Sequence, residues 1–216
     1  MPDISTNRVP GGAGPADQGR HVAWAYSGPA DPLVGTGATP AERWLAYGAA
    51  AALAAVIVGA DAVREEPIAQ GWLVLVLAVF AFDIAGGAVA NMLNSCKRFY
   101  HAPLQAHEGG FARWAKSPRL FTAIHVHPII VAFLLGGSVW NAVIWYAALQ
   151  AAVAGTLATP LYLRRGVATG LTVFAILLEQ TVLPLGRGLE WFIPCLFLKM
   201  VMGHTVREEP YGRARP

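Results

Sequence analysis

Residues 71–95, GWLVLVLAVFAFDIAGGAVANMLNS, decide the fold of this protein. A helix that crosses a membrane needs about 20 mostly apolar residues, with roughly 17 to 25 tolerated. The stretch meets this requirement and contains a single charged residue, Asp83. It therefore predicts a membrane-spanning helix that carries an acid near its middle.

The rest of the chain repeats this pattern. Of its 216 residues, 55% are hydrophobic and only 13% are charged, whereas about a quarter of the residues in a soluble domain are charged. Further apolar runs long enough to cross a membrane lie at residues 44–62, 118–136, 139–159, 166–185 and 188–204. The sequence predicts an all-α, polytopic integral membrane protein, a bundle of about six transmembrane helices.

The basic residues predict the orientation of these helices. Of the 16 Lys and Arg residues, Arg64 and Arg187 fall on one side of the predicted membrane and Lys199 lies within a span, which leaves thirteen on the other side. Loops rich in Lys and Arg stay in the cytoplasm. We therefore expect a multi-pass protein of the cell membrane, the inner membrane in a bacterium, with both termini in the cytoplasm.

Composition divides the chain into three parts. Residues 1–41 are rich in Pro and Gly without a periodic apolar pattern and predict a disordered cytoplasmic tail. Residues 42–206 form the predicted six-helix domain, and residues 207–216 form a short cytoplasmic tail. The net charge of +3 is explained by the cytoplasmic loops, so we expect the protein to contact the lipid bilayer and no nucleic acid.

One face of the second predicted helix is polar. Six residues, from the middle of the membrane to its cytoplasmic boundary, share about a quarter of the circumference of an ideal helix. A carboxylate and two amides in hydrocarbon are costly unless they face a bundle interior or a partner, so the face predicts a functional site. Its members are Asp83, Gly87, Asn91, Asn94, Arg98 and His101.

The sequence His125, Val126, His127, Pro128 is the densest chemical motif. On a regular helix the two imidazoles would point about 160° apart. Pro128 favours a kink and an extended backbone at His127, which would bring the rings together. The pair could then hold a metal ion or haem, with His101 as a further candidate ligand, while structural and proton-handling roles are the alternatives.

Further candidate residues lie on the fifth and sixth predicted helices and in the connection 96–117. Lys199, at the depth of the histidine pair, either extends to the cytoplasmic surface or forms an ion pair with Asp83 or Glu179. Arg98 and Tyr100 belong to the long connection 96–117, whose aromatic and basic residues suit the membrane interface. We expect Arg98, Tyr100 and Glu179 to contact a substrate, and His204 to lie at the inner boundary.

Three functions fit these residues. A membrane-embedded enzyme acting on a lipid or apolar small molecule would use Asp83 or a histidine as a base, Asn91 and Asn94 to orient the substrate and Lys199 or Arg98 to stabilise negative charge, with acid–base or metal-assisted chemistry. A proton-coupled, ion or small-solute transporter would use Asp83 as its binding site. An accessory subunit of a membrane complex, or a homo-oligomer, would use the polar face for contacts. The polar residues converge on the cytoplasmic half of the predicted bundle, which favours the enzyme because a transporter needs access from both sides.

Overall fold

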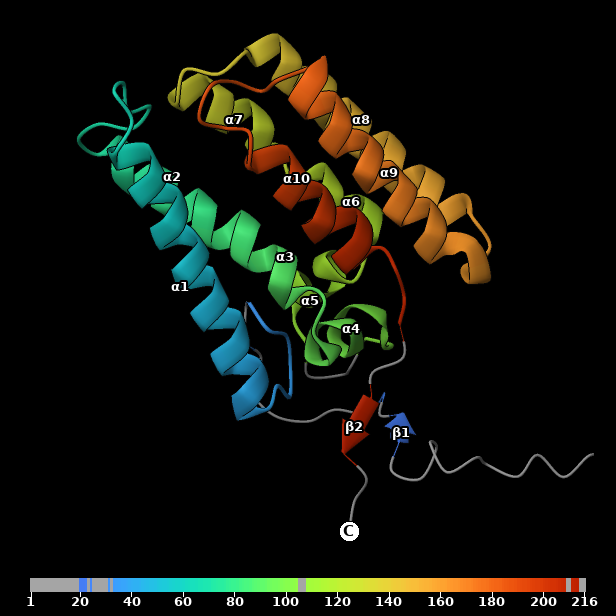
Figure 1. Ribbon diagram of the computed structural model, residues 1–216. Coiled ribbons are helices and arrows are strands. Elements are labelled where there is room, and N and C mark those ends of the chain that lie inside the picture. Colours follow the sequence, from blue (N-terminus) through green and yellow to red (C-terminus); the bar gives the residue numbers. More distant parts are fainter. Residues whose placement is uncertain are drawn as a thin grey trace, which may run out of the picture.

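The computed structural model describes residues 20–22, 24, 31, 33–104, 108–208 and 211–213, and most of the predicted tail 1–41 lies outside them. Within these residues the protein is a helical bundle (Figure 1). Four helices are long and apolar enough to cross a membrane: Pro40–Ala62, Leu73–Ala90, Val139–Ala158 and Leu161–Thr181. Two shorter apolar helical segments cover Pro118–Leu134 and Phe192–His204. The protein is therefore all-α in architecture, and its helices support a location in a membrane.

Helix α1 (Pro40–Ala62) begins at a capping box. Thr39 accepts a hydrogen bond from the backbone of Glu42 at 3.2 Å, and the Glu42 carboxylate accepts one from the backbone of Thr39 at 2.8 Å. These bonds satisfy backbone groups that the first turn of a helix leaves unpaired. Farther along, α1 buries small residues, and a Cβ atom on Gly86 of the neighbouring helix would collide with Ala50. Small side chains thus allow the two helices to pack closely.

The second long helix is not a regular α-helix. It consists of α2 (Leu73–Phe80), the π-helical segment η2 (Ala81–Ala85) and α3 (Gly86–Ala90). It ends before the predicted position because Leu93 is extended, with ψ 149°, and α4 (Asn94–His101) starts afresh beyond it. The predicted polar face, drawn on one ideal helix, is therefore interrupted twice, by the π-helical turn and by the break.

The connection that follows is partly helical. It contains α5 (Gly110–Ala115), and the next apolar segment is divided into α6 (Pro118–Ala123) and α7 (His127–Leu134). The division falls at the residues before Pro128, where a proline removes a backbone donor. This is the kink that the proline predicted.

The last helices enclose the main core. Helices α8 (Val139–Ala158) and α9 (Leu161–Thr181) pack beside α10 (Phe192–Phe197), which continues as the π-helical segment η3 (Leu198–His204). Fully buried core side chains from these elements include Trp145, Leu149, Phe192, Leu196 and Met200. Burial of this apolar surface holds η3 in the centre of the bundle.

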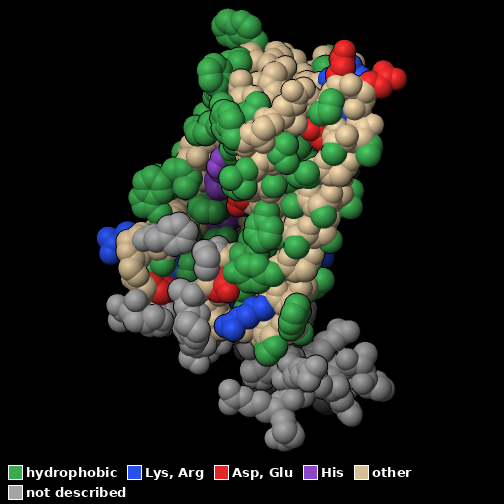
Figure 2. Space-filling view, turned by 90° about the vertical axis from the view of Figure 1, so that its left-hand side faces the viewer, with side chains coloured by type: hydrophobic (Ala, Val, Ile, Leu, Met, Phe, Trp, Pro, Cys, Tyr) green, Lys and Arg blue, Asp and Glu red, His purple; other side chains and the backbone are tan. Residues whose placement is uncertain are grey.

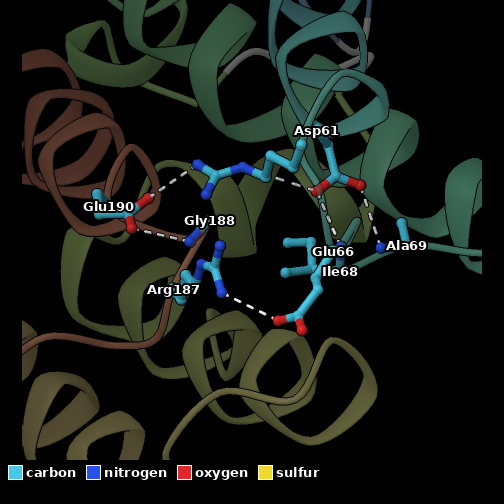
Figure 3. Close-up of polar contacts among 8 residues, drawn as sticks. Asp61, Glu66, Ile68, Ala69, Arg187, Gly188 and Glu190 are labelled. Atoms are coloured by element: carbon cyan, nitrogen blue, oxygen red, sulfur yellow. Dashed lines mark hydrogen bonds and ion pairs between the residues drawn. The ribbon is translucent and has the colours of Figure 1, made fainter.

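The two ends of the bundle differ. At one end, strand β1 (Arg20–Val22) pairs in an antiparallel manner with β2 (Tyr211–Arg213), below α4 and to one side of the start of α1 (Figure 1). Residues 33–39, within the predicted tail, pack there, with Val34 fully buried. At the other end, two loops are joined by ion pairs: Arg187 with Glu66 at 3.0 Å and Arg64 with Glu190 at 3.6 Å (Figure 3).

Candidate functional site

Asp83 and Lys199 form an ion pair inside the bundle. The Lys199 ammonium lies 2.9 Å from Asp83 Oδ1, and the side-chain exposures are 6% for Lys199 and 44% for Asp83. Of the two partners considered for Lys199, Asp83 is the one it contacts. Asp83 lies in η2 and Lys199 in η3, so both members stand on π-helical segments. Single π-helical turns inside α-helices occur frequently at functional sites.

Two glycines make room for this contact. A Cβ atom on Gly87 would lie 2.7 Å from both Cδ and Cε of Lys199, closer than nonbonded carbon atoms approach. A Cβ atom on Gly203 would lie 2.6 Å from the Cβ of Asn91. The absence of side chains at both positions therefore lets α3 and η3 touch and lets the lysine reach Asp83.

Asn91 connects the ion pair to Tyr100. Its Nδ2 donates to the backbone carbonyl of Lys199 at 3.1 Å, and its Oδ1 accepts a hydrogen bond from the Tyr100 hydroxyl at 3.4 Å. Burial raises the pKa of the Tyr100 phenol well above its usual value, so the hydroxyl keeps its proton and acts as a donor. Asn91 thus holds the backbone that carries Lys199.

The histidine pair lies beside the same site. The ring centroids of His125 and His127 are 4.9 Å apart, with the rings nearly perpendicular. The rings meet because the chain turns between α6 and α7, where Val126 has φ −73° and ψ 8°. From the sequence we expected an extended backbone at His127, and this was wrong because His127 is the first residue of helix α7, although the rings do approach each other.

The two rings differ in their hydrogen bonds. His125 Nδ1 lies 2.6 Å from the backbone carbonyl of Phe121. A carbonyl only accepts, so Nδ1 of His125 carries a proton and Nε2 is the nitrogen that can exchange one in the neutral ring. Nδ1 of His127 is buried and has no hydrogen-bond partner among the residues that the structure describes. His127 therefore keeps a nitrogen available for a bound molecule.

A third histidine, His204, closes the site from η3. It is completely buried, and neither ring nitrogen has a partner in the described part of the chain. Its ring stacks on Phe121 at 4.5 Å between centroids and meets the edge of Tyr100 at 4.1 Å. The sequence analysis placed His204 at the inner boundary and did not connect it with Phe121, because an aromatic residue in an apolar helix carries no signal of its role.

The site reaches the surface of the bundle from the side. Asp83 and His127 are partly exposed, whereas His125, His204 and Lys199 are buried. Figure 2 shows histidine and acidic atoms together about halfway along one face, in a recess bordered by hydrophobic side chains. A molecule could reach the carboxylate from the apolar side of the bundle, at the depth where lipid chains would lie.

Four predicted site residues lie elsewhere. Arg98 pairs with Glu42 at 3.9 Å and donates to the carbonyl of Gly37 at 3.3 Å, which ties α4 to the start of α1. Asn94 opens α4, past the break that interrupts the polar face. Glu179 accepts a hydrogen bond from the backbone of Leu185 at 2.9 Å, in the loop that follows α9. The fourth, His101, lines a pocket at the end of α4.

The predicted metal ligands form only a pair. In the residues described by the structure, no three or more His, Cys, Asp or Glu side chains are placed to hold one metal ion. His101 does not join His125 and His127 in such a group. The metal or haem site remains a prediction, and the structure places two of its candidate ligands, the imidazoles of His125 and His127, side by side.

The site as a whole is a set of proton donors and acceptors. A carboxylate, an ammonium group, imidazoles and a phenol from four parts of the chain converge within apolar surroundings. Such groups can bind a polar centre and move protons at it. Comparisons of the chain with protein-family models, with curated proteins and with solved structures find no significant match.

Proposed function

We propose that this protein is a membrane-embedded enzyme that acts on a lipid or another apolar small molecule by acid–base chemistry at Asp83. The observation that carries the proposal is the ion pair of Asp83 and Lys199 between two π-helical segments, in which the lysine is buried and the aspartate is partly exposed at a lateral recess. A charged pair in a membrane bundle is costly, so its presence indicates a function.

The residues around the pair have complementary roles in this proposal. Asp83 is the proton acceptor, because its side chain is partly exposed while its partner is buried. His127 lies beside it as a second proton carrier, with an unpaired nitrogen in the described structure. Lys199 stabilises negative charge that develops on the substrate, and its buried position strengthens that interaction. Asn91 and Gly87 are positioning residues that act through Lys199.

One-sided access favours an enzyme over a transporter. Between Asp83 and the end of the bundle that holds the Glu66 and Arg187 ion pair, the interior is filled by apolar side chains such as Leu77, Phe192 and Ile193, which are at most 1% exposed. The ion pairs of Figure 3 join the loops at that end. A transporter needs access from both sides, and this packing supplies none at that end.

We also propose that the bundle crosses the membrane six times, with both termini in the cytoplasm. Helices Pro118–Leu134 and Phe192–His204 would be the third and sixth crossings, shorter than the four long helices. The pairing of β1 with β2 supports an even number of crossings, because it places the two ends of the chain together. The excess of basic residues at that end supports a cytoplasmic location.

A comparison of lipid extracts tests the enzymatic proposal. Membranes from cells that produce the wild-type protein, Asp83→Asn, Lys199→Met or Glu66→Gln are extracted, and apolar compounds are compared by untargeted mass spectrometry. We expect wild type and Glu66→Gln to change the same compound, and Asp83→Asn to leave it unchanged. Glu66 is the matched control because its carboxylate also forms an ion pair but lies exposed at the far end of the bundle.

Three outcomes contradict the proposal. An identical profile for wild type and Asp83→Asn removes Asp83 from the chemistry. A proton or solute flux in proteoliposomes that depends on Asp83, without any changed compound, identifies a transporter. Purification in a fixed ratio with another membrane protein, again without a changed compound, identifies an accessory subunit.

A further inference from the structure

A cavity lies at the end of the bundle where α4 stops and α6 begins. Its volume is about 480 Å³. It is built by the last residues of α4, by α5, by the first residues of α6 and by the segment after η3. The polar side chains that line it belong to Tyr100, His101, Arg113, Lys116, Ser117 and Arg207.

The cavity carries an excess of positive charge. Lys116 is compensated in part, since its ammonium lies 3.3 Å from the Glu108 carboxylate and donates to the carbonyl of Ala102 at 3.1 Å. Arg113 and Arg207 are exposed, and neither pairs with an acidic side chain within the described residues. The Arg207 guanidinium lies over the ring of Trp24 at 4.6 Å, which orients it. Two guanidinium groups therefore remain available to an anion.

The cavity adjoins the candidate site. Tyr100 lines it and also donates to Asn91, which in turn holds the backbone of Lys199. Pro118 lines it as well and opens α6, the short helix at whose other end the chain turns into His125. A molecule with its polar group in the cavity could therefore place an apolar part near the histidine pair.

The surroundings of the cavity suit a membrane interface. Leu104, Trp114 and Leu120 are between 42% and 49% exposed, and they alternate with Arg113 and Arg119. Tryptophan and basic residues together are typical of the level of lipid headgroups. The cavity thus stands where the headgroup of an amphiphile would lie.

We propose that this cavity binds the phosphate or diphosphate group of an amphiphilic substrate, whose apolar part extends along the bundle toward Asp83. The identification of the bound molecule as the substrate rests on the proposed function, whereas the binding itself does not. Guanidinium groups bind phosphate through paired hydrogen bonds, and basic pockets at the cytoplasmic end of membrane helices bind phosphorylated headgroups.

Binding of simple amphiphiles to the purified full-length protein in detergent tests the proposal. The probes are dodecyl phosphate, dodecanol and inorganic phosphate, and binding is measured by native mass spectrometry and by competition. We expect dodecyl phosphate to bind at least about tenfold more tightly than dodecanol or inorganic phosphate. The double variant Arg113→Gln and Arg207→Gln should lose this preference, while Arg187→Gln, an exposed arginine at the other end, should keep it.

The outcomes separate this inference from the proposed function. Equal binding of dodecyl phosphate and dodecanol, or an unchanged preference in the double variant, overturns the inference. Inorganic phosphate that competes as well as dodecyl phosphate also overturns it, because the cavity would then be a site for the free anion. Asp83→Asn should bind dodecyl phosphate like wild type, so a failure of Asp83 in the lipid comparison leaves the binding result intact.

Discussion

At the scale of single residues, the unequal burial of Asp83 and Lys199 is the main energetic feature. The lysine is almost fully enclosed, whereas nearly half of the aspartate side chain is exposed. Removing one member of a buried ion pair costs more than the pair contributes, because the remaining charge stays without compensation. The loss should therefore be larger when the buried lysine is the charge left behind.

A double-mutant cycle measures this asymmetry. We expect Asp83→Asn to lower the free energy of unfolding by about 3 kcal/mol, and Lys199→Met to lower it by less. The variant that carries both substitutions should be more stable than Asp83→Asn alone, since no unpaired charge remains. Unfolding in mixed micelles of increasing denaturing detergent gives the values, and equal losses for the two single variants would contradict the expectation.

Gly87 offers a second test at this scale. Gly87→Ala places a methyl group 2.7 Å from two carbons of Lys199, so the end of this side chain must shift, which alters the position of the ammonium beside Asp83. We expect at least about a tenfold loss in formation of the compound identified by lipid analysis. Gly48→Ala is the control, because a methyl group there meets no atom within 4 Å. Unchanged activity of Gly87→Ala would show that the close approach is not required.

Asp83 could be recognised from the sequence, but its geometry could not. An acid in an apolar helix is a strong signal because burial without a partner is costly. The sequence left the ion-pair partner of Lys199 open between Asp83 and Glu179. A π-helical turn contains an extra residue, which moves the side chains that follow it to another face of the helix. No residue pattern in η2 or η3 predicts such a turn.

At the scale of elements, the sequence located the helices better than their irregularities. The apolar runs mark the four long helices because hydrocarbon requires them. Pro128 predicted the division between α6 and α7. Residues 91–93, where the helix breaks, contain no proline or glycine. The break separates Asn94, Arg98 and His101 from the helix that carries Asp83, so these residues do not share the continuous polar face that the sequence predicted.

Pro128→Ala tests whether the division between α6 and α7 matters. With a backbone donor restored, the helix can continue, and His125 and His127 would then point in nearly opposite directions. We expect formation of the identified compound to fall by about tenfold or more, with no loss of stability. Pro40→Ala is the matched control, because Pro40 lies in the first turn of α1, where no helix precedes it. Full activity in Pro128→Ala would exclude a role for the paired rings.

Lys97 makes the contact between α4 and η3 dependent on pH. Its ammonium donates to the carbonyls of Gly203 at 2.6 Å and Val206 at 2.8 Å, and burial lowers its pKa to about 8. Between pH 8 and 10, the unfolded chain holds a proton that the folded protein has released. Stability should therefore rise with pH in this window, by at most about 1.4 kcal/mol per pH unit.

The comparison with Lys97→Met isolates this contribution. Both proteins contain the same other titrating groups, so the difference between their unfolding free energies reports Lys97 alone. We expect the unfolding free energy of the wild type minus that of Lys97→Met to increase from pH 8 to pH 10 and to be constant below pH 7. A constant difference over the whole range would mean that the ammonium is not penalised by burial.

At the scale of the whole molecule, the two ends of the bundle are chemically different. One end holds the paired termini, the basic cavity and most of the basic residues. The other end is joined by ion pairs that involve Asp61, Glu66 and Glu190 (Figure 3). The strand pairing is compatible with the proposed even number of crossings, and the proposed orientation rests on the positive-inside rule.

Cysteine labelling tests this orientation directly. In a variant without Cys96 and Cys195, the substitutions Glu66→Cys and Arg165→Cys introduce single thiols at exposed positions, 81% and 70% accessible in the native side chains. A maleimide that cannot cross membranes should label Glu66→Cys in intact cells and Arg165→Cys only after permeabilisation. Labelling of both in intact cells would contradict the three crossings proposed between them, Leu73–Ala90, Pro118–Leu134 and Val139–Ala158, and labelling of Arg165→Cys alone would reverse the orientation. The reversed orientation would also move the basic cavity and its arginines to the outer face, so the orientation decides from which side a phosphorylated amphiphile reaches Asp83.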